Sequence, residues 1–501
     1  MGEIGGFLHI HRVGFDKRDP SERVRDHAHY FETQPDAELQ RQGARCMDCG
    51  VPFCHLGCPL GNLIPDWNDQ VYRGRWQEAI DQLHATNNFP EFTGRICPAP
   101  CESACVLDIN DDPVTIQQLE LGIVEHAFRE GWVRPQPPPM RTGRSVAVVG
   151  SGPAGMAAAA ELNKRGHRVT VFERDEGVGG LMRFGVPDSK LEKRVIDRRA
   201  SVLEEEGVVF TCNVEVGRDL GVAELREDFD AVVIATGSRV ERRLTIPGSD
   251  LAGVHAAMDY LYGRNRAVAR AAGDEPSRAA PEPEHEISAA GKRLVVIGGG
   301  DTGMDCLSNA RREGALGVTI LDTYQEIPPS GRYEHIPWPL SAKRTPSTYA
   351  LDESGERRWG TQAIRLEGED GRVARVHACE VRGTSTSDAE PVPGTEFSLP
   401  ADLVLVAIGF SHPQHEGLVE RLGVELDSRG NVKAGTYATS QEGVFAAGDA
   451  RRGQSLIVWA IAEGRRCARV VDRWLTDRRA PLPLGAELTG TPGDAGILPS
   501  A

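Results

Sequence analysis

The sequence contains 501 residues, 40% of them hydrophobic, which is enough for two or three domains with ordinary cores. A formal net charge of −16 argues against nucleic acid as a partner, because phosphates require a basic surface. The sequence has no apolar run long enough to cross a membrane, and its first residues lack the apolar core of a signal peptide. We therefore expect a cytoplasmic protein with no membrane partner.

Seven of the eleven cysteines lie in two runs near the N-terminus, RCMDCGVPFCHLGCP and CPAPCESAC, which in a reducing cytosol indicates a metal centre rather than a disulfide framework. The first run has the spacing C-x2-C-x4-C-x3-C-P. It is similar to bacterial ferredoxins, in which three close cysteines bind one [4Fe–4S] cluster and the fourth binds another. We therefore expect Cys46, Cys49 and Cys54 to bind one cluster. Cys58 then begins a second.

Seven thiolates do not fill the eight iron positions of two four-iron clusters. By the same rule, the second run supplies one thiolate to the first cluster and two to the second. The eighth position is then filled by another group or left open. Zinc is the alternative metal, although closed zinc sites favour paired C-x2-C knuckles or mixed Cys and His ligands. A stiff proline-rich segment, RPQPPPM, ends this cysteine-rich and helix-like region.

The next segment, RSVAVVGSGPAGMAAAAELNKRGHRVTVFER, predicts a buried strand, a glycine turn, an alanine-rich helix and a second strand. Its three glycines have the G-x-G-x-x-G spacing of a dinucleotide-binding βαβ unit. The first glycine permits a tight turn, the second lets the backbone approach a pyrophosphate, and the third lets the helix pack closely. An acid follows the second strand, where it accepts a hydrogen bond from a ribose hydroxyl. The predicted site comprises Gly150, Gly152, Pro153, Ala154, Gly155 and Glu173.

Further motifs favour FAD over NAD at this first site. A Gly-Gly-Leu segment follows the acid, and DAVVIATGS predicts a strand that runs into a Thr-Gly turn. VFAAGDARRGQS places an aspartate after another strand, where it can hold the ribityl or pyrophosphate region. Together these features resemble the two-dinucleotide flavoprotein family, in which an inserted nicotinamide domain splits the FAD domain. The additional predicted FAD-binding residues are Gly180, Leu181, Thr236, Gly237, Gly448, Asp449 and Ser455.

A second glycine turn, KRLVVIGGGDTGMDC, repeats the pattern about 150 residues later. The next strand ends at Asp322, which accepts from a free 2′-hydroxyl and repels a 2′-phosphate, and so favours NADH. Arg332 lies nearby and can serve a 2′-phosphate, so NADPH stays open. Two dinucleotide sites in one chain indicate hydride transfer from nicotinamide to flavin. The predicted nicotinamide-coenzyme residues are Gly298, Gly300, Asp301, Thr302, Gly303, Asp322 and Arg332.

Beside the two glycine turns, three stretches resemble the small (beta) subunit family of bacterial glutamate synthases: RCMDCGVPFCHLGCPLGNLIPDWNDQVYRGRW, TNNFPEFTGRICPAPCESACVL and GDARRGQSLIVWAIAEGR. The likeness extends over roughly residues 1–475. Chains related to this family include the electron-entry half of dihydropyrimidine dehydrogenase. The likeness implies an oxidoreductase that oxidises NADH or NADPH on FAD and relays electrons through two [4Fe–4S] clusters. It also implies a hetero-oligomer with an FMN-containing large (alpha) subunit, which makes glutamate from glutamine and 2-oxoglutarate. We assign no catalytic acid or base to this chain.

The resemblance also implies which residues bind each cluster. The first cluster takes Cys46, Cys49, Cys54 and Cys105. The second takes Cys58, Cys97 and Cys101, with Glu120 at the position where the pyrimidine-reducing relative has a Gln ligand. The segment TYQEIPPSGRYEHIPWP after Asp322 departs from the Arg-rich segment of NADPH-specific members, which leaves the coenzyme open.

The expected fold is α/β, with an N-terminal helical iron–sulfur domain followed by two Rossmann-like dinucleotide-binding domains, the nicotinamide domain inserted in the FAD domain. The expected limits are 1–140 for the cluster domain, 141–256 and 426–480 for the FAD domain, 257–425 for the NAD(P)H domain, and 481–501 for a C-terminal tail.

Two other functions stay open. One is a stand-alone NAD(P)H:acceptor oxidoreductase that delivers electrons to a ferredoxin, a sulfur compound or a pyrimidine-reducing partner. The other is a zinc-scaffolded binding module, which analysis of iron and labile sulfide would separate from the first two.

Overall fold

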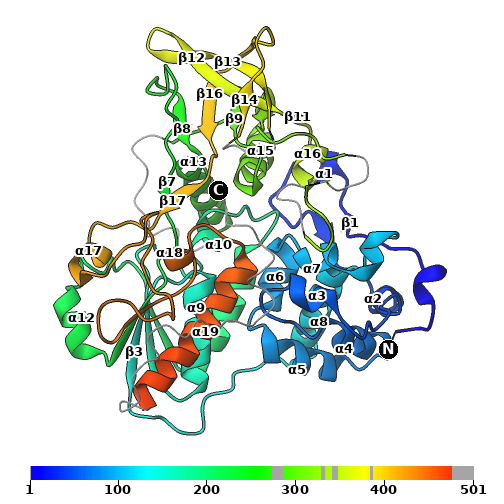
Figure 1. Ribbon diagram of the computed structural model, residues 1–501, viewed down its shortest axis with the longest axis vertical. Coiled ribbons are helices and arrows are strands. Elements are labelled where there is room, and N and C mark those ends of the chain that lie inside the picture. Colours follow the sequence, from blue (N-terminus) through cyan, green and yellow to red (C-terminus); the bar gives the residue numbers. More distant parts are fainter. Residues whose placement is uncertain are drawn as a thin grey trace.

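The computed structural model describes residues 2–273, 286–328, 333, 335–340, 348–383 and 388–476. They form three units: a helical unit in blue at the right of Figure 1, an α/β unit at the lower left, and a second α/β unit at the top. Arg332 and the expected tail at 481–501 lie outside the described residues. Among the helices of the described chain, none has both the length and the apolar character needed to cross a bilayer.

Short helices build the N-terminal unit, and its longer helices each bury an apolar face. Trp67, Val71 and Leu83, for example, are fully enclosed. All seven clustered cysteines lie in or beside α3 and α7, which contact each other. The elements are η1 (Gly6–Leu8), β1 (Asp16–Lys17), α1 (Pro20–Arg23), β2 (Phe31–Glu32), α2 (Asp36–Gly43), α3 (Phe53–Gly57), α4 (Ile64–Tyr72), α5 (Trp76–Thr86), α6 (Pro90–Ile96), α7 (Pro100–Ser103), η2 (Val106–Ile109) and α8 (Ile116–Arg129).

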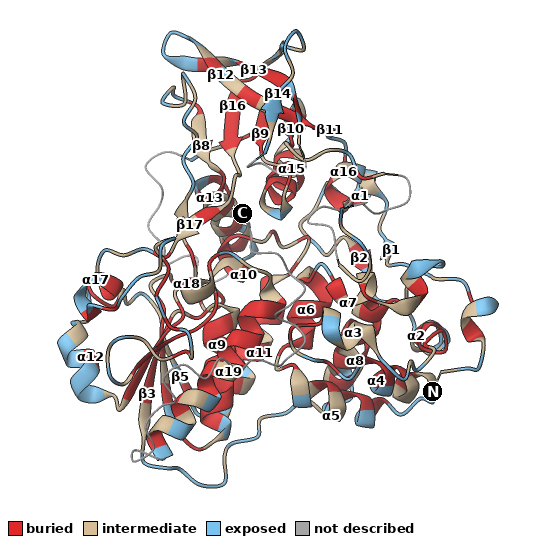
Figure 2. Cartoon of the chain, in the orientation of Figure 1, coloured by how far each residue is buried: buried red, intermediate tan, exposed pale blue. Residues whose placement is uncertain are grey.

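The first α/β unit contains a parallel sheet of order β18-β6-β3-β4-β5. Helices α9 and α19 lie side by side across it, and Figure 2 shows both largely buried. They approach closely because Gly464 has no side chain: a Cβ there would lie 2.2 Å from the Ala154 carbonyl oxygen. The elements are β3 (Ser145–Val149), α9 (Pro153–Lys164), β4 (Arg168–Phe172), α10 (Leu181–Phe184), α11 (Lys193–Glu205), β5 (Val208–Thr211), α12 (Val222–Asp228), β6 (Ala231–Ile234), β18 (Val444–Ala446), α18 (Asp449–Arg452) and α19 (Ile457–Thr476).

The second α/β unit has its own parallel sheet, of order β11-β10-β9-β16-β8. A smaller antiparallel sheet of β12, β13, β14 and β15 caps it at the top of Figure 1. The elements are β8 (Val254–Ala256), α13 (Ala257–Ala272), β9 (Arg293–Ile297), α15 (Asp301–Glu313), β10 (Gly317–Leu321), α16 (Tyr349–Asp352), β11 (Glu356–Arg358), β12 (Thr361–Glu369), β13 (Arg372–Arg382), β14 (Glu390–Pro391), β15 (Phe397–Pro400) and β16 (Leu403–Val406).

The second unit is inserted in the first, and the chain crosses between them at a two-stranded antiparallel ribbon. Its strands are β7 (Val240–Glu241) and β17 (Phe410–His412). The expected limits of 257–425 differ from this division. Strand β8 already pairs within the second sheet, and α17 (Leu418–Leu422) packs on α12 of the first unit. Sequence alone does not show where the crossing lies, because the crossing strands are short.

Residues 16–32, which we call the N-terminal strap, fasten the second α/β unit to the rest of the chain. From the strap, Arg23 Nε donates to Glu353 Oε1 of the second α/β unit at 2.8 Å. In that unit Arg312 Nη1 also lies 2.6 Å from Glu353 Oε2. All three side chains are at most 1% exposed. The Tyr30 ring stacks on that of Tyr349 with centroids 4.2 Å apart. Nothing in the sequence pattern indicated this network, because Arg23 and Glu353 are 330 positions apart.

Candidate cofactor sites

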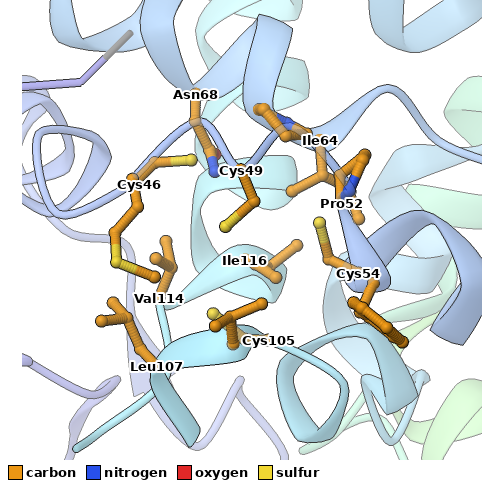
Figure 3. Close-up of a pocket in the computed structure, with 14 residues that line it drawn as sticks. Cys46, Cys49, Pro52, Cys54, Ile64, Asn68, Cys105, Leu107, Val114 and Ile116 are labelled. Atoms are coloured by element: carbon orange, nitrogen blue, oxygen red, sulfur yellow. The ribbon is translucent and has the colours of Figure 1, made fainter. Parts of the chain in front are cut away.

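Four thiols of the helical unit face one pocket (Figure 3). They belong to Cys46, Cys49, Cys54 and Cys105. These are the four cysteines expected at the first cluster, and the structure brings them together although Cys105 is distant in sequence. The rest of the lining is mostly apolar: Met47, Pro52, Phe53, Ile64, Pro65, Asn68, Val106, Leu107, Val114 and Ile116.

The environment of these thiols opposes negative charge unless a cation compensates it. Burial raises the pKa of Cys46 to about 11 and raises the pKa of Cys54 well above its usual range. Hydrogen bonds to the Cys46 sulfur from the Asn68 side chain and the Asp48 backbone act in the opposite direction. Four thiolates in an apolar pocket need a positive centre, which an iron–sulfur core provides. The residues present therefore fit a four-iron cluster.

The spacing of the thiols also bears on the kind of metal. Across the described residues, no three His, Cys, Asp or Glu side chains converge closely enough to hold a single ion. A tetrahedral zinc site brings its thiolates to about 3.8 Å from one another, because each Zn–S bond is about 2.3 Å. A four-iron cluster instead binds each thiolate at a different iron, so its ligands stand farther apart around a cavity. The four thiols in Figure 3 surround their pocket, and they do not converge as a single-ion site requires.

The thiols of the remaining three clustered cysteines lie near one another, since beyond the effect of burial Cys58 raises the pKa of Cys97 and both raise the pKa of Cys101. Cys58 ends α3, Cys97 follows α6, and Cys101 lies in α7. Burial raises the pKa of Cys58 to about 11 and those of Cys97 and Cys101 well above the usual range. The Glu120 carboxylate, on α8, further raises the pKa of Cys97, which places the acid beside the thiols.

Glu120 is buried and partly committed to other partners. Its Oε1 accepts hydrogen bonds from Asn87 Nδ2 at 2.8 Å and from Asn62 Nδ2 at 3.3 Å. Burial raises the pKa of Glu120 to about 7. A nearby positive iron centre would favour its ionised form. Its place beside three thiols fits the expected eighth ligand.

The first glycine turn has the shape that a pyrophosphate needs. Gly150 has a φ of +105°, and a Cβ there would lie 2.5 Å from the Ala235 carbonyl oxygen. A Cβ on Gly155 would lie 1.9 Å from the Gly150 oxygen, so α9 starts directly on the turn. No atom lies within 4 Å of a Cβ placed on Gly152. Space is thus open at the start of α9, where Pro153 and Ala154 follow.

Glu173 is held by the turn itself. Its Oε2 accepts from the Ser151 backbone N–H at 3.0 Å and from the Ser151 hydroxyl at 2.5 Å. Ser151 Oγ also accepts from the Gly179 N–H at 3.0 Å. A Cβ on Gly180 would come within 3.1 Å of Gly152 Cα. Ser151 therefore joins the turn, the acid and the Gly-Gly-Leu segment that leads into α10 at Leu181, a role that the sequence analysis missed.

Polar groups after β6 and β18 complete this first site. The Thr236 hydroxyl, next to Gly237, is buried and has no hydrogen-bond partner among the described residues, so a bound ligand can use it. Gly448 has a φ of +69° and starts α18. Asp449 follows, and burial raises its pKa to about 6. The Ser455 hydroxyl donates to Asp449 Oδ1 at 2.5 Å. These groups fit the polar chain of FAD.

The second glycine turn repeats the backbone of the first. Gly298 has a φ of +117°, and a Cβ there would lie 2.3 Å from the Ala407 carbonyl oxygen. A Cβ on Gly303 would lie 2.1 Å from the Gly298 oxygen. Gly300 caps α15, which begins with Asp301 and Thr302. The backbone thus fits a second dinucleotide.

The acid of the second site differs from that of the first. Asp322 follows β10 as expected, but its carboxylate forms an ion pair with Arg357, whose Nη2 lies 2.6 Å from Asp322 Oδ2. The Asp322 and Arg357 side chains are 1% and 3% exposed. The sequence analysis missed Arg357 because it lies 35 positions beyond Asp322.

A segment of the second α/β unit also reaches the first thiol pocket. The Trp338 indole Nε1 donates to the Cys105 carbonyl oxygen at 3.1 Å. Its ring lies 4.6 Å from that of Phe53, between centroids. Trp338 belongs to the segment that departs from the Arg-rich pattern in sequence. This part of the segment therefore contacts two residues that line the thiol pocket, Cys105 and Phe53.

Comparisons with known proteins agree with this architecture. Residues 23–132 match the family model of dihydropyrimidine dehydrogenase domain II, 4Fe-4S cluster. Residues 144–340 and 349–464 match that of pyridine nucleotide-disulphide oxidoreductase. The fold also resembles the structure of Mycobacterium tuberculosis FprA in complex with NADPH, with a TM-score of 0.53 at 20% identity, covering 69% of this chain and 86% of that one.

Two curated relatives align with almost the whole chain. Glutamate synthase [NADPH] small chain from Mycobacterium tuberculosis is 51% identical over 494 residues, which are 98% of this chain and 100% of that one. Glutamate synthase [NADH] from Schizosaccharomyces pombe is 41% identical over 515 residues, which are 99% of this chain and 23% of that one. An identity of 51% over almost the full length of both chains places this chain and the Mycobacterium tuberculosis small chain in one family. The chain belongs to the glutamate synthase small-chain family.

Proposed function

We propose that this chain is the electron-input subunit of a glutamate synthase. It oxidises NADPH on FAD and relays the electrons through two [4Fe–4S] clusters to an FMN-containing large subunit. That partner makes L-glutamate from glutamine and 2-oxoglutarate. The observation that carries this proposal is that one chain, 51% identical to a glutamate synthase small chain, joins two glycine turns to a pocket lined by four thiols.

The chain's own residues bind and insulate the redox groups. The turn from Gly150 to Gly155 would hold the FAD pyrophosphate, and Asp449 with Ser455 would hold its polar chain. The clustered cysteines would hold the two clusters, and Trp338 contacts two residues of the first thiol pocket. FAD held here would convert a two-electron donor into single electrons, which suits clusters that carry one electron each. No residue of this chain is assigned to glutamine hydrolysis.

Two observations support NADPH as the coenzyme. The bacterial relative that shares 51% of its residues is named for NADPH. In addition, the acid expected to exclude a 2′-phosphate is paired with Arg357. We therefore revise the preference for NADH that Asp322 alone indicated.

The fission-yeast relative supports a large partner. Its matched region is only 23% of a much longer glutamate synthase chain, so this module is joined there to the rest of the synthase. In the present protein the same contact would form between separate subunits.

The test uses the full chain purified without oxygen. With NADPH it should reduce artificial dyes, contain about eight irons, as two four-iron clusters require, and make no glutamate until the large subunit is added. Cys97→Ala should abolish synthesis with the partner but spare much of the dye reduction, because dyes take electrons directly from the flavin.

Glutamate formation by the isolated chain would contradict the proposal, as would synthesis by Cys97→Ala with its partner. Stoichiometric zinc in place of iron would also contradict it. If the large subunit neither binds nor restores synthesis while dyes are reduced, the chain is a stand-alone NAD(P)H:acceptor oxidoreductase.

A further inference from the structure

We infer that Arg357 is the specificity-determining residue that admits the 2′-phosphate of NADPH to the second dinucleotide site. The inference rests on the proposed function, which makes this the coenzyme site. It also changes the role of Asp322 from that of a lone acid after the second strand, because Arg357 neutralises its charge.

Arg357 lies where the adenosine ribose of a coenzyme would bind. Its strand, β11, pairs in parallel with β10, and Arg357 is in register with Ile320. The Arg357 Nη2 donates to the Gly299 carbonyl oxygen at 3.1 Å, inside the glycine turn. In such folds the ribose 2′ position lies between this turn and the end of the second strand. The guanidinium therefore stands at the position that separates NADPH from NADH.

The pair with Asp322 removes the repulsion that a free acid would exert. Arg357 donates from Nη2 at 2.6 Å and from Nε at 3.2 Å to the same oxygen, Asp322 Oδ2. Asp322 Oδ1 accepts from the Tyr324 N–H at 3.2 Å. A Cβ on Gly299 would lie 2.0 Å from Asp322 Oδ2, so the carboxylate is pressed against the turn. Both of its oxygens are thus engaged by the protein.

Trp359 fixes the plane of the guanidinium. The Arg357 Cζ lies 3.4 Å from the centroid of the Trp359 ring. Stacking of this kind orients arginine without using its N–H donors. Because Nε and Nη2 of Arg357 already donate to Asp322 and Gly299, the guanidinium acts here as a fixed counter-charge to the acid. The site therefore presents a neutralised acid to a 2′-phosphate, which a free carboxylate would repel.

The next residue offers a matched control. Arg358 is also a cation on β11, but it pairs with the exposed Glu356 at 2.8 Å, its side chain is 34% exposed, and its Cζ lies 4.9 Å from the Phe397 ring centroid. It faces away from the turn, because neighbouring residues of a strand point to opposite sides. Removing either cation changes the net charge equally.

The experiment compares Arg357→Met and Arg358→Met as holoenzymes with full FAD and iron content. Flavin reduction by NADPH and by NADH is followed by stopped flow, and binding of NADP+ and NAD+ to the oxidised protein is measured by equilibrium dialysis. Arg357→Met leaves the Asp322 carboxylate without its counter-charge, and it should weaken NADP+ binding and raise the KM for NADPH by roughly 10- to 100-fold because like charges then meet at the 2′ position. NADH should change by less than about threefold, and Arg358→Met should leave both coenzymes within that limit.

A second variant tests the sign of the Asp322 assignment. Asp322→Asn removes the negative charge but keeps the size of the side chain, and it should tighten NADP+ relative to NAD+ by several-fold. Arg357→Lys, which keeps the charge but loses the planar fork, should give an intermediate loss of NADP+ binding.

The inference is overturned if Arg357→Met weakens NADP+ and NAD+ equally, since Arg357 would then act only on the fold of the turn. It is also overturned if wild type binds both coenzymes equally, or if Asp322→Asn and Arg357→Met change NADP+ binding in the same direction. If wild type reduces its flavin with neither coenzyme, the proposed function fails instead.

Discussion

The two glycine turns of this protein share a backbone but differ in what holds the acid of each site. Both turns begin with a glycine at positive φ, at +105° for Gly150 and +117° for Gly298. In both, a Cβ on that glycine would lie within 2.5 Å of the carbonyl oxygen of a residue after the neighbouring strand. The residue after this glycine is Ser151 in the first turn and Gly299 in the second.

That one difference decides the chemistry of each acid. Ser151 offers an N–H and a hydroxyl to Glu173, so the first turn satisfies its own acid. Gly299 has no side chain that could bond to Asp322, and Asp322 instead pairs with Arg357 on the next strand of the sheet. A shared nucleotide-binding motif therefore predicts that an acid is present, whereas the groups packed around the acid decide what it recognises.

A second feature is common to both units. In each unit an aspartate directly before one strand, β6 or β16, pairs with an arginine at or just before the start of the neighbouring strand, β3 or β9. Asp230 lies 2.9 Å from Arg144 Nη1, and Asp402 lies 2.7 Å from Arg293 Nη2. Each pair joins the starts of two neighbouring strands, at the end of the sheet opposite to the glycine turn.

The largest effects should come from breaking each turn separately. Gly150→Ala should abolish FAD binding, and Gly298→Ala should weaken NADP+ binding by more than about tenfold, because a side chain at positive φ costs 1–2 kcal/mol even before its clash with backbone. FAD content is read from flavin absorbance, and NADP+ binding by equilibrium dialysis. Loss of FAD in Gly298→Ala would show that the two sites do not form independently.

An intermediate effect should follow from breaking the buried ion pairs that join the strap to the second α/β unit. Glu353→Gln removes the buried counter-charge that Arg23 and Arg312 share, and should lower the free energy of unfolding by about 3–5 kcal/mol. The matched control is Glu425→Gln, an exposed acid paired with the exposed Lys433, and it should cost under about 1 kcal/mol. Both are measured by denaturant unfolding of the holoprotein, with FAD content as a second readout. Equal losses of stability in the two variants would show that the buried ion pairs of the strap contribute no more to stability than an exposed pair.

The smallest effect concerns the aspartate–arginine pairs at the strand starts. The hydrogen bonds from Arg293 lower the pKa of Asp402 to about 2, below its usual 3.8. The pair therefore stabilises the fold above about pH 4, and this contribution is lost as the pH falls toward 2. Since the Asp402 side chain is 37% exposed, Asp402→Asn should cost at most about 1 kcal/mol at pH 7.

The control for the Asp402 pair is Asp230→Asn in the first unit, where hydrogen bonds from the Ser145 N–H and from Arg144 lower the pKa of the acid. Unfolding free energies at pH 7 and at pH 5 should give the same small loss for each variant. A loss in Asp402→Asn that grows as the pH falls would contradict the assigned direction.

The sequence by itself determined the features that depend on local spacing. The three glycines of each turn, the apolar strands before them and the spacing of the first four cysteines are read within short windows, because tight turns and cluster loops constrain neighbouring residues. From these alone the two dinucleotide folds, the helical cysteine-rich unit and the family resemblance followed. The insertion of one α/β unit in the other followed from the resemblance.

The tertiary structure decided everything that depends on partners far apart in the chain. Arg357 reaches Asp322 only because β11 pairs beside β10, and Arg23 meets Glu353 only because the strap crosses to another unit. Trp338 likewise donates to the carbonyl oxygen of Cys105, 233 positions earlier in the chain. Such contacts leave no periodic trace in sequence, since a buried charge is tolerated wherever a distant partner compensates it. For the same reason, the coenzyme preference that we propose depends on Arg357, which lies outside the glycine motif and pairs with Asp322 only in the folded chain.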